Sequence, residues 1–228
     1  MPKFALLLCC CLLAGYAPAT AQASVYTVAK IAVNTQASDA VTAKEQAIRE
    51  GSQRAFRRLL WRMVAFKAHD RLPELSDAAI DGMLDGFVVR EERFSSTRYI
   101  ATLDFTFEAG KVRDLLNRIG LPHTDQQSPP VTLLPVAQGD VSGAWRAAWG
   151  ALDLRNGLAP LEMPPAGAAT LPAGMDVTPR AVEALQSRLG AQRLVLAAAA
   201  FDSADNRLRV ALRGEDAVGR FAFAQSFR

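Results

Sequence analysis

The chain has 228 residues, of which 50% are hydrophobic and 21% are charged. This length and composition exclude a disordered polymer, a collagen-like fibre and a small protein held together by disulfides. The formal net charge of +3 is too small for a dedicated nucleic-acid binder. We therefore expect a folded protein that buries one large core or two modest ones and has no nucleic-acid partner.

Residues 1–23 have the three-part pattern of a secretory signal peptide. Lys3 supplies a positive start, Phe4–Ala14 is an uncharged apolar run, and Ala21 and Ala23 fit an A-x-A cleavage site. The apolar run is far shorter than the ~20 residues that span a bilayer, which disfavours an uncleaved anchor. The pattern predicts export, with cleavage after Ala23 and Ala21 as the second choice.

All three cysteines, Cys9, Cys10 and Cys11, lie in this leader. After its removal we expect no disulfide, no thiolate nucleophile and no cysteine-bound metal. Lipidation is not expected, because leucines rather than a small residue precede Cys9. We also expect no transmembrane segment after signal removal, since the later apolar stretch Leu194–Phe201 is too short to span a membrane.

After the leader, the first elements are a strand and a long helix. Alternation predicts a strand over Val25–Val33 with its odd-numbered residues on one face. Thr42, with Glu45 three residues later, predicts a capped helix that runs to about Phe66. The stripe of that helix predicted to be buried contains Ile48, Ser52, Ala55, Phe56, Leu59, Leu60, Met63 and Phe66.

The next segment predicts a short helix over Asp77–Leu84 and then a change to a period of two. The stretches Phe87–Phe94 and Arg98–Phe107 flank a polar turn and predict an antiparallel hairpin. A helix over Glu108–Ile119 follows, with Gly120 as its left-handed stop. These elements make a first module, residues 24–121.

Residues 122–130 are rich in proline and glutamine and predict a linker to a second module, residues 131–228. The predicted fold class is therefore α+β, with two small modules of mixed, largely antiparallel sheets packed against helices. In the second module we expect strands over Val131–Val136, Leu158–Met163, Arg193–Phe201, Arg207–Leu212 and Gly219–Phe227, one helix that begins at Ser142, and one from Thr178-Pro179 to Gly190.

Recognisable hydrophobic segments are spread along most of residues 25–200. They include the strand Val25–Val33, the helix end Leu59–Arg62, and the segments Asp104-Phe105, Leu115–Asn117 and Gly120–Pro122. Together they resemble a bacterial family of secreted proteins catalogued as a domain of unknown function. The resemblance implies an envelope protein of proteobacterial type without an assigned activity.

The second module has landmarks of its own. They are Val131–Pro135, Gly157-Leu158, Leu189–Leu196 and the strand Arg207–Leu212. This pattern is loosely similar to the amino-terminal domain of TolB-type periplasmic proteins. A likeness of fold would imply an interaction module by analogy alone.

The sequence contains no catalytic or nucleotide-binding signature. Its two histidines, His69 and His123, fall in connecting segments without a partner at ligand spacing, so surface histidines are favoured over metal ligands. We therefore expect no cofactor and no metal, and the sequence does not decide whether the protein is an enzyme.

Two polar clusters have structural interpretations that we favour. Asp202, Asp205 and Asn206 carry the oxygen ligands that calcium prefers, yet a hairpin turn uses the same residues for its own backbone. Asp81 and Asp85, four residues apart in the predicted short helix, have the spacing of an acid–base pair but are typical of a solvated helix face.

Trp145 and Trp149 lie one turn apart on the predicted helix of the second module. Such a pair can stack on a sugar or a peptide. Core packing is favoured, because Ala148 and Leu152 share the same stripe.

The outer face of the long first helix is the candidate binding surface. With Leu59 at the centre of the buried stripe, 100° per residue places Trp61 on the opposite side. Three hypotheses remain open: local contacts, with Trp61 stacked on Arg57 and Glu50 paired with Arg54; a partner-binding patch; or an interdomain anchor covered by the second module. The candidate partner-binding residues are Arg54, Arg57, Arg58 and Trp61.

These observations favour a periplasmic, non-catalytic binding or accessory protein of the cell envelope, whose partner is an envelope protein or another envelope component. One alternative is an envelope hydrolase whose site is assembled from residues scattered along the chain. Another is a structural scaffold that oligomerises through its sheet edges.

Overall fold

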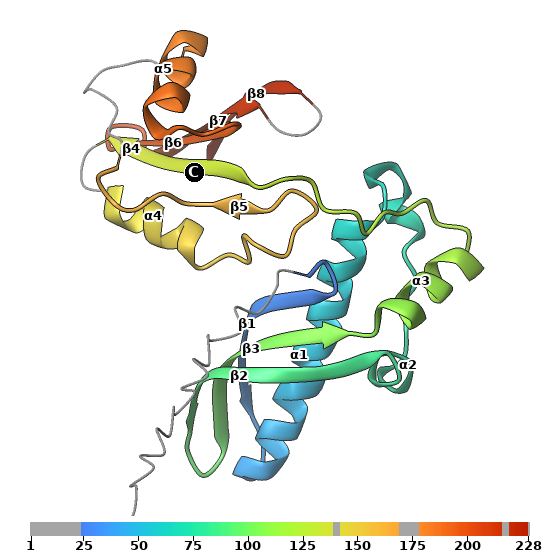
Figure 1. The fold of residues 1–228 in the computed structure, drawn as a ribbon. Coiled ribbons are helices and arrows are strands. Elements are labelled where there is room, and N and C mark those ends of the chain that lie inside the picture. The colour runs from blue at the N-terminus through green and yellow to red at the C-terminus, as the bar shows by residue number, and fades with distance from the viewer. Residues whose placement is uncertain (1–23, 139–141, 169–177, 216–218, 228) are drawn as a thin grey trace, which may run out of the picture.

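A computed structural model describes residues 24–138, 142–168, 178–215 and 219–227 (Figure 1). The predicted leader, residues 1–23, lies outside the described residues. The first part of the chain contains β1 (Thr27–Gln36), α1 (Ala40–Met63), the 3₁₀ helix η1 (Phe66–Arg71), α2 (Asp77–Asp81), β2 (Leu84–Phe94), β3 (Arg98–Phe107) and α3 (Ala109–Arg118). The second part contains β4 (Val131–Gln138), α4 (Ser142–Gly150), β5 (Leu161–Glu162), α5 (Pro179–Leu189), β6 (Leu194–Asp202), β7 (Arg207–Glu215) and β8 (Arg220–Phe227).

The strands form two separate sheets. The first has three antiparallel strands in the order β1-β3-β2. The second has five strands in the order β5-β4-β6-β7-β8, and β4 pairs in parallel with both of its neighbours while the other pairs are antiparallel. The predicted α+β fold class, with mixed and largely antiparallel sheets packed against helices, is confirmed.

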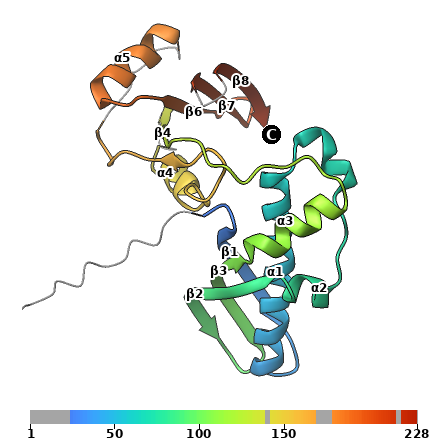
Figure 2. The same cartoon turned by 45° about the vertical axis from the view of Figure 1, so that its right-hand side comes forward.

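Helix α1 covers one face of the first sheet, as both cartoon views show (Figure 2). Its small buried residues allow the helix to approach the strands closely: the position of a Cβ on Gly51 lies 2.9 Å from the Phe105 ring. Leu59, Leu103 and Phe105 are fully buried in the resulting core. The predicted buried stripe is confirmed from Ser52 to Met63, whereas its first member, Ile48, is only half-buried and its last member, Phe66, is exposed.

Both predicted ends of α1 were wrong. The cap is Asp39, whose carboxylate accepts a hydrogen bond from the Thr42 main-chain nitrogen at 2.9 Å, so the cap lies three residues before the expected one, Thr42. It ends at Met63 because residues 122–124 pair with its last turn through a bridge between Val64 and His123. Phe66, expected in the buried stripe, is therefore 85% exposed.

Strand β1 begins two residues later and ends three residues later than predicted, and its alternation is interrupted. Ala29 and Lys30 together oppose Asp104 of β3, which makes a β-bulge, and Lys30 has a φ of 58°. One extra residue moves the following side chains to the other face. As a result Val28 and Ile31 are both buried, so the prediction that the odd-numbered residues share one face along the whole strand was wrong.

The short second helix was predicted too long. Helix α2 ends at Asp81, and residues from Leu84 onward belong to β2. The predicted hairpin is confirmed, with β2 pairing along β3. The predicted stop of α3 is also confirmed, since Gly120 has a φ of 66°.

In the second sheet, α4 and α5 pack on separate hydrophobic clusters. The cluster under α5 contains Val182, Leu185 and Leu196, while the cluster under α4 contains Leu133 and Ala197. Thr178 caps α5 and Gly190 ends it in the left-handed conformation, as predicted. The strand expected over Leu158–Met163 shrinks to the two residues of β5.

The predicted linker, residues 122–130, packs against both parts of the chain. Asp125 accepts hydrogen bonds from the Tyr26 hydroxyl at 2.6 Å and from Arg113 at 3.1 Å. Ser128 donates its main-chain nitrogen to the Leu158 carbonyl at 2.8 Å. These contacts tie the segment to the first sheet and to the second module.

Candidate functional site

The outer face of α1 presents the four residues that the helical period placed there. Arg54, Arg57, Arg58 and Trp61 are all exposed, and Trp61 is 58% exposed. Their spacing of three and four residues puts them on neighbouring turns of one helix. The structure therefore gathers the predicted residues on one accessible surface.

An aromatic cluster lies at the end of this surface, formed by Trp61, Phe66 and His69. The Trp61 and His69 rings stack with centroids 6.1 Å apart and planes 8° apart. The Phe66 ring meets His69 edge-on at 5.4 Å. His69 is held in place by a hydrogen bond from Nε2 to the Val64 carbonyl at 3.0 Å. The fixed imidazole thus orients two exposed rings.

The arginines of this surface keep their charge available. Arg54 donates Nε to the main-chain carbonyl of Glu50 at 3.3 Å, and the Glu50 carboxylate instead accepts from Thr35 and Gln46. In the described part of the chain, no hydrogen bond or ion pair engages Arg57 or Arg58. We call Arg54, Arg57, Arg58 and the aromatic cluster the outer-face patch.

Two of the three hypotheses for Trp61 are wrong. The second module does not cover this ring, which is 58% exposed, so it is not an interdomain anchor. The local account named the wrong contacts, because Trp61 stacks on His69 and the contact between Arg54 and Glu50 is made to the main chain. The partner-binding hypothesis stays a prediction.

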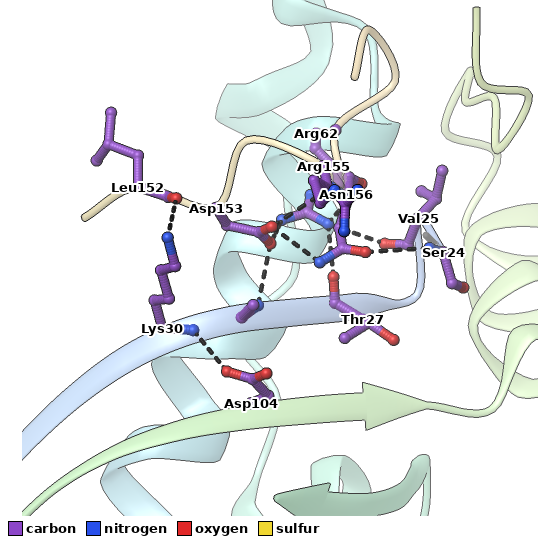
Figure 3. A network of polar contacts seen from close by, with 12 residues as sticks. Ser24, Val25, Thr27, Lys30, Arg62, Asp104, Leu152, Asp153, Arg155 and Asn156 are labelled. Atoms are coloured by element: carbon purple, nitrogen blue, oxygen red, sulfur yellow. Dashed lines mark hydrogen bonds and ion pairs between the residues drawn. The ribbon is translucent and has the colours of Figure 1, made fainter. Parts of the chain in front are cut away.

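A second group of polar side chains joins the two sheets, and we call it the joint (Figure 3). Arg62, at the end of α1, donates to the carbonyls of Val25, Thr27 and Asn156 at 3.1, 2.8 and 2.8 Å. It also forms an ion pair with Asp153 at 3.0 Å, and the two side chains are only 15% and 10% exposed. One guanidinium therefore connects α1, β1 and the loop that follows α4.

The bulge of β1 completes the joint. Because Ala29 and Lys30 leave the strand ladder, their main-chain nitrogens need other acceptors, and they donate to Asp153 at 3.0 Å and to Asp104 at 2.9 Å. The Lys30 ammonium donates to the Gly150 and Leu152 carbonyls. The carboxylates and cations of the joint form hydrogen bonds and ion pairs with one another and with main-chain groups. A buried polar connection of this kind is stable because its hydrogen-bonding groups have partners.

The structure also places the other polar candidates from the sequence. Asp202 accepts from the Ala204 main-chain nitrogen at 3.1 Å and pairs with Arg209, as the turn interpretation predicted. Asp81 ends α2 and Asp85 lies in β2, so the two do not share a helix side. Within the described ranges, no group of three or more His, Cys, Asp or Glu side chains is placed to hold a metal ion.

The two tryptophans of α4 pack on the second sheet, as predicted. Trp145 donates Nε1 to the Ala197 carbonyl at 2.9 Å, and its ring meets Trp149 edge-on at 5.7 Å. The reason given for this packing was wrong, because Ala148 and Leu152 are both exposed, Leu152 at 51%. Trp149 Nε1 is buried without a hydrogen-bond partner among the described atoms.

The groups with shifted pKa values lie away from the outer-face patch. Burial and the hydrogen bond to Asp125 raise the pKa of Tyr26 to about 12. The same hydrogen bond, together with that from Arg113, lowers the pKa of Asp125. Burial and Glu92 likewise raise the pKa of Tyr99 to about 12. These shifts favour fixed hydrogen bonds, and none of these groups titrates near neutrality.

Sequence reasoning did not assign Phe66 and His69 to the outer-face patch, and it missed the joint. The sequence indicated the aromatic cluster only weakly, because Phe66 and His69 join Trp61 only if α1 ends at Met63, and that end was not predicted. The joint had no sequence signal, because Arg62 and Asp153 are separated by 91 positions.

Comparisons with known proteins leave the chain without an assigned relative: no protein-family model matches it, and no curated protein matches it significantly. Among the described residues, no helix combines the length and the apolar character needed to cross a membrane.

Proposed function

We propose that this chain is a periplasmic binding or accessory protein of the bacterial cell envelope that works without catalysis and recognises an envelope component through the outer-face patch. The observation that carries the proposal is the exposure of Trp61 and Phe66, at 58% and 85%, beside the unpaired Arg57 and Arg58.

The physical support comes from the cost of leaving such rings in water. Burying a large aromatic side chain stabilises a complex by about 2 kcal/mol, so two exposed rings held by His69 form a ready surface for a partner. Tryptophan and arginine are also the residues that dominate interface hot spots. The unpaired cations favour a partner that presents acidic groups.

Two further observations support the cellular setting. The pattern of residues 1–23 is that of an export signal. The landmarks along residues 25–200 resemble a family of secreted bacterial proteins. A periplasmic location agrees with both.

The experiment compares two double variants in affinity capture from envelope extracts. Trp61→Ala with Arg57→Ala removes an exposed ring and an unpaired cation from the outer-face patch. The matched control, Phe94→Ala with Arg93→Ala, removes an exposed ring and an exposed arginine from β2. Thermal unfolding of both variants is measured alongside.

The proposal predicts that the outer-face variant keeps its melting temperature within a few degrees and loses the captured component. The β2 variant should keep both. If the outer-face variant still captures the component, the outer-face patch does not bind it. Equal loss in both variants would show that capture depends on exposed apolar surface in general.

A further inference from the structure

The sheet edges of this protein differ in how they are protected against pairing with another strand. An unpaired edge adds a new strand readily unless charges, bulges, shortness or a covering segment prevent it. The outer edge of β2 carries Arg90, Glu91, Glu92 and Arg93, and its pairing is interrupted at two places. β5 is only two residues long, and the Asp153 loop covers β1 at its bulge.

β8 has none of these protections. It pairs with β7 without interruption, from Glu215 with Arg220 to Leu208 with Phe227. From Phe221 to Phe227 it contains no charged residue and no proline. Its other edge has no strand partner in the described part of the chain, and residues 222–227 are all exposed.

The two faces of β8 have different chemistry. One face carries Phe221, Phe223, Gln225 and Phe227, and the other carries Ala222, Ala224 and Ser226. The phenylalanine face continues the apolar cluster under α4, while Phe223 and Phe227 remain 48% and 46% exposed. The other face carries small side chains only.

We propose that β8 pairs antiparallel with β8 of a second copy, which joins the two five-stranded sheets into one continuous sheet around a two-fold axis at Ala224. In this register Ala224 faces its own equivalent, and Phe221 faces Phe227 of the second copy. Opposed residues then share a face, as an antiparallel ladder requires.

A second copy suits this edge better than an unrelated strand. An antiparallel pair of identical strands is self-complementary and closes on itself, so the assembly stops at two copies. The register creates two aromatic cross-strand pairs, which stabilise antiparallel sheets, and it opposes no charges between Phe221 and Phe227. Arg220, just outside this segment, is engaged by Glu215 and Glu183 of its own copy.

The test places charges on the proposed axis. Ala224→Lys sets two lysines opposite each other and should weaken the dimer on the order of tenfold or more. Ala224→Lys should weaken the dimer more than a negative charge at the same position, because Arg209 and Arg213 lie on the same face beside it and add to the repulsion. Ala224→Glu alone should also weaken the dimer. An equimolar mixture of the two variants should restore it, since each axis then holds one lysine and one glutamate.

Sedimentation velocity over a series of concentrations measures the assembly, and circular dichroism checks that each variant is folded. Val88→Lys is the matched control: it adds the same charge to another exposed apolar position, on β2, and should leave the dimer intact. Wild-type protein that stays monomeric throughout the series would overturn the proposal. So would a dimer that persists in Ala224→Lys, one that Val88→Lys dissociates, or a mixture that remains monomeric.

Discussion

The guanidinium of Arg62 lies 3.0 Å from the carboxylate of Asp153, and this ion pair connects the helix of the first sheet to the loop after α4. No motif in the sequence links these two residues. Their contact nevertheless organises the joint, because each also binds main-chain groups of β1.

Arg62→Ala should destabilise the protein by about 3 kcal/mol, because it leaves the nearly buried Asp153 carboxylate without its cation. Urea unfolding measures the loss. Arg209→Ala is the control, since its ion pair with Asp202 is largely exposed and should cost less than about 1 kcal/mol. Equal losses of unfolding free energy in the two variants would show that the nearly buried ion pair of the joint contributes no more than the exposed one.

Gly51→Ala should also destabilise the protein, by about 1–3 kcal/mol, although alanine favours helices. Its Cβ would approach the Phe105 ring to 2.9 Å and Val33 Cγ1 to 3.1 Å, and both are packed core side chains. Gly110→Ala in α3, where no atom lies within 4 Å of the new Cβ, should be neutral or stabilising. Thermal unfolding compares the stabilities of the two variants. A Gly51→Ala variant as stable as the wild type would mean that the neighbouring core side chains move to accommodate the new Cβ.

Asp39 should make the stability of α1 depend on pH in acid. The Thr42 main-chain nitrogen, and then the Thr42 and Ser38 hydroxyls, donate to its carboxylate and lower its pKa from 3.8 to about 2. A lowered acid pKa contributes stability that is fully present above pH 3.8 and is lost as the pH falls through about 2.

Asp39→Asn keeps a capping oxygen without the charge. The stability advantage of the wild-type protein over this variant should therefore shrink as the pH falls toward 2. Chemical unfolding across this pH range measures the difference. A difference that does not change with pH would contradict the assigned cause.

Local signals predicted the elements whose boundaries are decided by their own residues. Thr178-Pro179 and Gly190 set the ends of α5, and the polar turn between β2 and β3 produced the expected hairpin. The period of α1 likewise placed Trp61 on the outer face correctly. In each case the physical cause lies within a few residues of the effect.

Contacts between distant segments decided what the sequence could not predict. Helix α1 stops where residues 122–124 pair with its end, so Phe66 moved from the expected core to the surface. The bulge at Lys30 depends on acceptors from Asp104 and Asp153. No local pattern reports such partners, because they meet only after the sheets have formed.

The leader predicts one outcome that depends on none of these contacts. Protein recovered after export should begin at Ser24, and intact-mass analysis measures the start directly. A recovered chain that still begins at Met1 would contradict both the cleavage and the proposed location.

Such cleavage would change the chemistry of the joint. The main-chain nitrogen of Ser24 donates to Asn156 Oδ1 at 3.0 Å, and Asn156 in turn contacts Asp153. In the precursor this nitrogen is a neutral peptide amide. Cut after Ala23, it becomes a terminal ammonium that is largely protonated at neutral pH. Proteolytic maturation would then place a cation on Asn156, the residue that also contacts the Asp153 carboxylate, so the precursor and the mature protein would differ in how firmly their two halves are held together.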